Sequence, residues 1–192
     1  MTDNTALLWI DLETTGLDPK RDEIIEIASF LTDSDLNVIE ATCRQWVLRC
    51  SDEAFMRLCS NDAVRAMHQA SGLLDLVNAM RRRPPEEGGK ALRLADVRIA
   101  RDINDLNADR VHLAGSGVAE FDRRFIEKWL PLTADELHYR SIDLGVIRRA
   151  HEMWAGDLPS AVNDAKTHRA MDDLDCHLAE AQAFRNLWRN HP

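Results

Sequence analysis

The distribution of apolar and polar residues predicts three strands at the start of the chain. Residues 6–11 form an apolar run of the length of a buried strand, and residues 24–33 and 36–48 also read as strands. The polar tripeptide Asp33-Ser34-Asp35 predicts a tight turn between the second strand and the third. We therefore expect a meander of three neighbouring strands.

After Ser51 the pattern becomes helical, because apolar residues recur at intervals of three and four. Helices are predicted at 53–59, 61–67, 71–81, 90–106, 119–130, 143–154 and 169–189, and two further strands at 111–115 and 138–142. The segments Arg81–Gly89 and Pro159–Thr167 predict loops, the first of them exposed and mobile. Strands followed by alternating helices and strands indicate an α/β fold around a mixed sheet.

The composition is that of one globular domain, which we place at residues 1–192. Hydrophobic residues make up 45% of the chain and charged residues 30%, and no apolar run approaches the roughly 18 residues of a membrane span. The first residues lack the basic start and apolar run of a secretory signal. The four cysteines show no C-x-x-C spacing, so we expect reduced thiols. These features predict a cytoplasmic protein without a membrane partner.

The net charge of −9 argues against electrostatic capture of long nucleic acid over a broad surface. It leaves room for a small site, because acidic residues that bind metal ions lose their local negative potential when the ions are present. A short substrate held by a few contacts needs no basic groove.

Two acids at the end of the first strand, Asp11 and Glu13, carry the first chemical signal. Residues two apart in a strand point to the same face, so both carboxylates converge on one spot. Two neighbouring anions repel each other, and a divalent cation such as Mg²⁺ relieves that repulsion. The alternative is that the strand ends here and both acids are simply solvated.

Three later residues can join this site. Asp122 lies at the start of a predicted helix, where the helix dipole alone also explains a carboxylate. On a continuous helix His168 and Asp173 would lie about 140° apart. They converge if His168 belongs to the preceding loop, which also suits a catalytic base. The alternatives are a capping or surface histidine and acids that only interact with the helix dipole.

The order Asp-x-Glu, Asp, His-x-Ala-x-x-Asp resembles the DEDDh family of 3′–5′ exonucleases, which have an RNase H-like fold with a five-stranded mixed sheet flanked by helices. Other stretches look like the oligoribonuclease branch of that family. They are Thr15-Gly-Leu-Asp-Pro19, Asp22-Glu-Ile-Ile-Glu-Ile-Ala28, Met67-His68 with Ser71-Gly-Leu73, Asp122-Arg-Arg-Phe125, His138-Tyr-Arg140 with Asp143, and His168-Arg-Ala-Met-Asp-Asp-Leu174. They extend over nearly the whole chain in the family's order.

The resemblance implies hydrolysis of short RNA to nucleoside 5′-monophosphates with two divalent ions, Mg²⁺ or Mn²⁺. The matching metal-binding acids are Asp11, Glu13, Asp122 and Asp173, and the general base is His168. Two such ions stabilise the attacking and the leaving oxygen of an in-line displacement. Spacing alone leaves Asp172 as a rival of Asp173, and the family pattern favours Asp173.

The resemblance also implies four residues that bind the substrate. Leu17 matches a leucine that wedges against the terminal bases, and His68 matches a ring that faces the substrate. Tyr139 and Arg140 match residues that close around the 5′ phosphate, with the tyrosine reaching from a partner subunit, which implies a homodimer. Taken without the resemblance, these positions read as a core leucine, a surface histidine and a buried tyrosine.

The chain departs from the oligoribonuclease pattern near the third acid. Val118 stands where a serine is expected to cap the 5′ phosphate, Ala63 replaces an expected tryptophan, and Phe121 before Asp122 resembles the proofreading branch. These departures count against a strict preference for dinucleotides and leave open, as an alternative, a DnaQ-like exonuclease for single-stranded DNA or longer oligonucleotides. A non-catalytic nucleic-acid-binding module is a third, but the five filled catalytic positions count against it.

Overall fold

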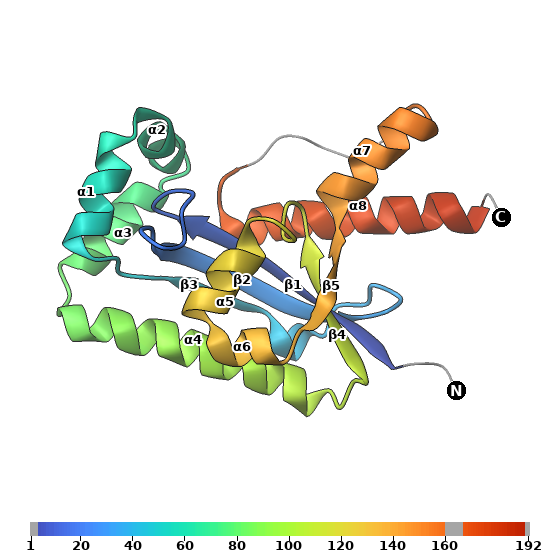
Figure 1. The fold of residues 1–192 in the computed structure, drawn as a ribbon, viewed down its shortest axis with the longest axis horizontal. Helices are drawn as coiled ribbons and strands as arrows, with labels where there is room; N and C mark the ends of the chain where they lie inside the picture. The colour runs from blue at the N-terminus through green and yellow to red at the C-terminus, as the bar shows by residue number, and fades with distance from the viewer. Residues whose placement is uncertain (1–3, 160–166, 191–192) are drawn as a thin grey trace.

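A computed structural model describes residues 4–159 and 167–190 (Figure 1). Within them lies a sheet of five strands, β1 Thr5–Thr14, β2 Ile24–Asp33, β3 Arg44–Val47, β4 Arg110–Gly115 and β5 His138–Asp143, in the order β3-β2-β1-β4-β5. Strands β1, β2 and β3 pair antiparallel, whereas β4 runs parallel to β1 and to β5. The predicted five-stranded mixed sheet is confirmed.

Helices cover both faces and one end of the sheet (Figure 1). They are α1 Asp52–Ser60, α2 Asp62–Ala70, α3 Leu73–Arg81, α4 Pro85–Asp105, α5 Asp122–Trp129, α6 Pro131–Asp135, α7 Leu144–Trp154 and α8 Ala170–Asn190, with a short 3₁₀ helix, η1 Glu40–Thr42. Helices α4 and α5 pack on one face and α8 packs on the other. Helices α1 and α3 form a separate cluster against β2.

Alternation along β1 decides which face carries the first two acids. Leu8 and Ile10 pack in the core under α4 and α5, whereas Leu7 and Trp9 pack under α8. Asp11 continues the second series, and so does Glu13, because the side-chain period of a strand is two. Both acids therefore lie on the face that α8 covers.

The third strand is much shorter than the predicted range of 36–48. Arg44–Val47 forms the regular ladder with β2, whereas Val38 makes only an isolated bridge with Thr32, and helix η1 interrupts the segment between them. The hydroxyl of Thr42 accepts a hydrogen bond from the backbone N–H of Leu31 at 2.9 Å and donates one to the carbonyl of Ile39. A side chain thus satisfies a donor of β2, so the backbone here leaves the sheet.

The predicted loop from Arg81 to Gly89 is also wrong in its second half, because helix α4 begins at Pro85. Proline is favoured at the first helical position, and the acids Glu86 and Glu87 in the first turn suit the helix dipole. A Cβ atom at Gly88 would lie 3.1 Å from the Cβ of Arg49, so this glycine permits close packing within a helix. The short helix α6 was not predicted.

The other predicted elements are confirmed within a few residues at their ends, including the turn after Asp33 and the start of α8 just after His168. Residues 160–166, most of the predicted polar loop, lie outside the described residues, as does the start of the chain, 1–3. No helix in the described part is both long and apolar enough to cross a membrane. All four cysteines are free thiols, as expected.

Candidate active site

A pocket of about 340 Å³ opens at the carboxyl ends of the neighbouring parallel strands β1 and β4. This is the edge of an α/β sheet at which ligands usually bind. Its lining comprises Asp11, Leu12, Glu13, Thr14, Gly16, Leu17, Val64, Met67, Ser116, Gly117, Phe121, Asp122, His168 and Asp173. The five residues predicted to form the catalytic site all lie in this lining, although they come from three separate parts of the chain.

The two acids of β1 are almost entirely buried. Asp11 is 9% exposed and Glu13 is 7% exposed. Glu13 lies directly opposite Glu26 in the antiparallel pair of β1 and β2, so two acidic residues are cross-strand neighbours. Burial of several anions costs free energy unless positive charge or hydrogen-bond donors compensate them.

Asp122, the first residue of α5, is fixed to β1 by a hydrogen bond. Its Oδ1 atom accepts from the backbone N–H of Leu12 at 3.1 Å. The regular pairing of β1 with β4 ends at Trp9 and Ala114, so the N–H of Leu12 lies beyond the last strand partner on this side. The carboxylate of Asp122 takes the place of that partner and lies beside the acids of β1.

Asp173 lies in the first turn of α8 and is 3% exposed. Its Oδ1 atom accepts a hydrogen bond from the backbone N–H of Thr167 at 3.0 Å and another from the Thr167 hydroxyl at 3.2 Å. The neighbouring Asp172 is exposed and does not line the pocket. Burial and position therefore separate two acids that spacing alone does not distinguish.

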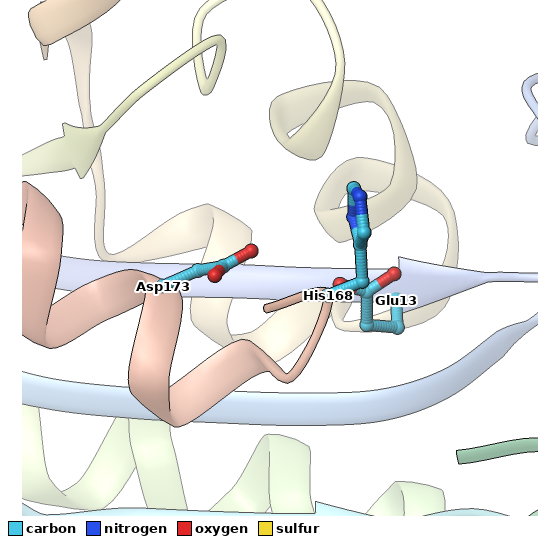
Figure 2. A group of neighbouring side chains, drawn as sticks. All are labelled: Glu13, His168 and Asp173. Atoms are coloured by element: carbon cyan, nitrogen blue, oxygen red, sulfur yellow. The ribbon is translucent and has the colours of Figure 1, made fainter. Parts of the chain in front are cut away.

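His168 precedes α8 and has a backbone φ of 55°, in the left-handed region that residues other than glycine rarely adopt. This conformation brings its ring beside Glu13 (Figure 2). Ligand atoms of Glu13, His168 and Asp173 all lie within 4.8 Å of one another. The structure thus contains a candidate metal site whose oxygen donors suit a hard divalent cation.

His68 does not face the pocket, contrary to the sequence prediction. It is 0% exposed on α2, where its Nε2–H donates a hydrogen bond to the carbonyl of Thr14 at 3.0 Å. Its Nδ1 lies 3.8 Å from Oε2 of Glu13, and burial lowers the pKa of the ring. His68 therefore links α2 to the end of β1. Val64 and Met67 of the same helix line the pocket instead.

Leu17 is 74% exposed and lies at the rim of the pocket, so it is not a core leucine. The turn that carries it is stiffened by a hydrogen bond from the Thr14 hydroxyl to the carbonyl of Gly16. A side chain at Gly16 would collide with the carboxylate of Asp22, which also accepts from the N–H of Asp18. A large apolar side chain is thus held in solvent by an ordered turn.

Tyr139 and Arg140 lie on the edge strand β5 and are both exposed. The tyrosine is 70% exposed, which excludes the alternative of a buried tyrosine. The Arg140 guanidinium lies 5.2 Å from the centre of the Tyr139 ring. Neither residue lines the pocket of its own chain.

Sequence reasoning missed Ser116. Val118 occupies the position of the expected serine but is 1% exposed and belongs to the core, whereas Ser116, two residues earlier, lines the pocket. The glycines on both sides of Ser116 were the available signal of a turn that presents it. Ala63 is exposed and lies outside the pocket lining.

The chain is similar in sequence to known exonucleases. Residues 8–56 match the family model described as Exonuclease. The chain is 34% identical to an oligoribonuclease of Mannheimia succiniciproducens, over 96% of this chain and 93% of that protein. It is also 34% identical to the oligoribonuclease of Escherichia coli K12, over 93% of each.

Solved structures show the same fold. The zinc-bound complex of E. coli exonuclease I with single-stranded DNA superposes with a TM-score of 0.65 at 16% identity. The similarity covers 96% of this chain but only 41% of exonuclease I, so this chain matches about two fifths of that protein. The RNase H-like fold predicted from the sequence is confirmed.

Proposed function

This chain belongs to the oligoribonuclease family, and on that basis we propose that it is a 3′–5′ exoribonuclease. Its substrates are short single strands of RNA, which it hydrolyses to nucleoside 5′-monophosphates. The observation that carries the proposal is the assembly of four carboxylates and one histidine in the lining of one pocket. Its place of action in this proposal is the cytoplasm, as expected from the sequence.

Two divalent ions, Mg²⁺ or Mn²⁺, are the cofactors in this proposal. Asp11, Glu13, Asp122 and Asp173 would hold them, and they fit that role because they offer oxygen donors that are buried together. When bound, such ions neutralise the clustered carboxylates, lower the pKa of water and stabilise the charge of an in-line phosphoryl displacement.

His168 acts as the general base. It lies two residues before the start of α8 and beside Glu13. An imidazole is suited to take a proton from an attacking water near neutral pH. Because His168 precedes α8 and is not part of the helix, its ring can approach both Glu13 and Asp173.

The bases of the substrate meet an apolar lining. Leu17, Val64, Met67 and Phe121 face the pocket, and apolar or stacking contacts with base faces tolerate any sequence. The pocket is small and the chain is acidic, so a substrate of a few nucleotides suits it better than a long strand. Ser116 offers a hydroxyl to the phosphate or ribose of the substrate.

A homodimer is part of the proposal. Tyr139 and Arg140 are exposed on an edge strand and lie outside their own pocket, which supports their insertion into the site of a second subunit. An edge strand also presents unpaired backbone groups to a partner. In this arrangement each active site contains residues of both subunits.

A second candidate function is a 3′–5′ exonuclease for single-stranded DNA or longer oligonucleotides. The burial of Val118 favours it, because this position lacks a donor for a terminal phosphate. A time course with 5′-labelled RNA and DNA of graded length, in Mg²⁺, Mn²⁺ or EDTA, separates the two functions. Preferential loss of the shortest RNA supports the oligoribonuclease, and equal stepwise shortening of all strands supports the general exonuclease.

A further inference from the structure

Glu26 of β2 is a fully buried carboxylate, 0% exposed, that takes no part in the pocket lining. It nevertheless accepts hydrogen bonds from three groups. The Arg169 guanidinium donates through Nε and through a terminal nitrogen, the latter at 2.8 Å from Oε1. The backbone N–H of Ala170 donates to Oε2 at 3.1 Å, and the Gln45 side chain donates to Oε1 at 3.0 Å.

These contacts hold the backbone on one side of His168. Arg169 and Ala170 directly follow it, and Ala170 is the first residue of α8, so Glu26 satisfies one of the N–H groups that a helix start leaves unpaired. On the other side of His168, Thr167 donates twice to Asp173. His168 is therefore fixed from both sides.

The backbone of His168 needs that support. Its φ of 55° is unfavourable for a residue with a Cβ atom, and such a conformation persists only where the surrounding contacts impose it. Hydrogen bonds on one side alone would leave the peptide free to rotate towards a more common conformation. The paired contacts of Arg169 and Thr167 supply the constraint.

Arg169 also balances two acids. Glu26 lies directly opposite Glu13 in the sheet, and both are buried. Hydrogen bonds and charge from Glu26 raise the pKa of the Arg169 guanidinium, and the charge of Glu13 acts in the same direction. The guanidinium therefore compensates the buried Glu26 through hydrogen bonds and charge, and Glu13 through charge alone.

We infer that Glu26 and Arg169 form a positioning pair that holds His168 in place beside Glu13 and Asp173. The inference rests on the proposed function, because it assigns the pair a part in the reaction that His168 serves. Neither residue touches the substrate pocket, so the pair acts through the backbone of His168. Its loss lowers turnover and leaves the four carboxylates in place.

The chain offers a matched control. Arg148 of α7 and Glu180 of α8 form a second bidentate pair, through Nε and a terminal nitrogen, and the side chain of Glu180 is only 3% exposed. Neither residue lines the pocket. Arg148→Ala thus removes a comparable buried ion pair of α8 at a residue that does not line the pocket.

The test compares Arg169→Ala with Arg148→Ala in single-turnover cleavage of an RNA dinucleotide with Mn²⁺. We expect turnover of Arg169→Ala to fall roughly 10- to 100-fold, the cost of a small misplacement of a catalytic group. The enzyme concentration that gives half the maximal single-turnover rate and the Mn²⁺ concentration for half-maximal activity stay at the wild-type values. Guanidinium chloride at millimolar concentration, far below the molar range that unfolds proteins, restores part of the turnover.

Three results overturn the inference: full turnover of Arg169→Ala, an equal loss in Arg148→Ala, or a rise in Mn²⁺ requirement that accounts for the loss. Glu26→Gln serves as a second variant. It keeps the shape of the side chain but loses its charge, so we expect reduced turnover that guanidinium does not restore.

Amide hydrogen exchange of residues 167–174 tests the inference independently of activity. Faster exchange there in Arg169→Ala but not in Arg148→Ala supports the positioning role, and unchanged exchange overturns it. If the wild-type protein cleaves neither RNA nor DNA, the proposed function fails, while the exchange result still decides whether the pair orders the loop.

Discussion

The carboxylate of Asp122 accepts a hydrogen bond from the backbone N–H of Leu12, the residue between Asp11 and Glu13, although the two partners are 110 residues apart in the chain. The third acid of the pocket is thereby attached to the strand that carries the first two. This contact fixes the relative positions of three carboxylates by the fold alone. The contact therefore holds the acids of β1 and α5 next to one another.

Two substitutions at Asp122 separate its structural part from its chemical part. Asp122→Asn keeps an oxygen that can accept from Leu12, so we expect wild-type stability but strongly reduced turnover. Asp122→Ala leaves the buried N–H of Leu12 without its acceptor, which costs about 1–3 kcal/mol in addition. Urea unfolding and turnover of both variants measure the two effects. Equal stabilities of the two variants would contradict the role of the hydrogen bond.

Ser116 lines the pocket and Val118 lies in the core, so we expect a substitution at each to act by a different route. Ser116→Ala removes a hydroxyl from the pocket, so we expect weaker turnover of a dinucleotide, with less effect on longer strands. Val118→Ser does not restore a phosphate contact, because this position is buried in the core. It instead buries a hydroxyl, at a cost of about 1–3 kcal/mol when the group stays unpaired. Turnover of RNA of graded length with each variant tests both expectations, and a gain in dinucleotide turnover from Val118→Ser would refute this assignment.

Tyr139 provides a test of the shared active site. Because its side chain is 70% exposed, Tyr139→Ala should leave the stability of the subunit within the roughly 0.5 kcal/mol usual for surface changes. If the ring acts in the partner's site, turnover falls all the same. A mixture of Tyr139→Ala and Asp11→Asn subunits then regains activity, since each mixed dimer holds one site with both residues intact. A mixture no more active than its components would rule out a site shared in this way.

Cys50, in the core cluster beside α1, makes the stability of the fold depend on pH. Burial raises the pKa of the Cys50 thiol from 9.0 to about 11, so the folded state keeps this proton at a pH where the unfolded state releases it. Stability from this group is full below pH 9 and is lost as the pH rises towards 11, by about 3 kcal/mol in total for two units. Urea unfolding of wild type and Cys50→Ala across this range isolates the contribution. A Cys50→Ala protein with the same pH dependence as wild type would disprove it.

The sequence predicted those features of the fold and the site that follow from the regular geometry of a single strand or helix. The period of two in a strand places Asp11 and Glu13 on one face without knowledge of the tertiary structure. The start of α8 after His168 likewise followed from the geometry of a helix, because only a loop position lets His168 approach Asp173. The family pattern supplied the choice of Asp173 over Asp172.

Tertiary contacts decided what the sequence could not. His68 and Met67 are neighbours on one helix, and only the packing of α2 against β1 determines that the methionine lines the pocket and the histidine is buried. Helix α4 tolerates Gly88 because Arg49 packs closely there, which no local pattern reveals. The role of Arg169 was equally hidden, since Glu26 lies 143 residues away.

The most direct test of the central claim is the release of mononucleotides from a 5′-labelled RNA dinucleotide by wild-type protein and by Asp11→Asn. We expect complete conversion by the wild type with Mn²⁺ or Mg²⁺ and none in EDTA. Asp11→Asn should lose more than the roughly 100-fold that removal of an outer-shell partner of a metal site costs. Conversion that persists in EDTA, or that is unchanged in purified Asp11→Asn, would contradict a metal-dependent exoribonuclease at this site.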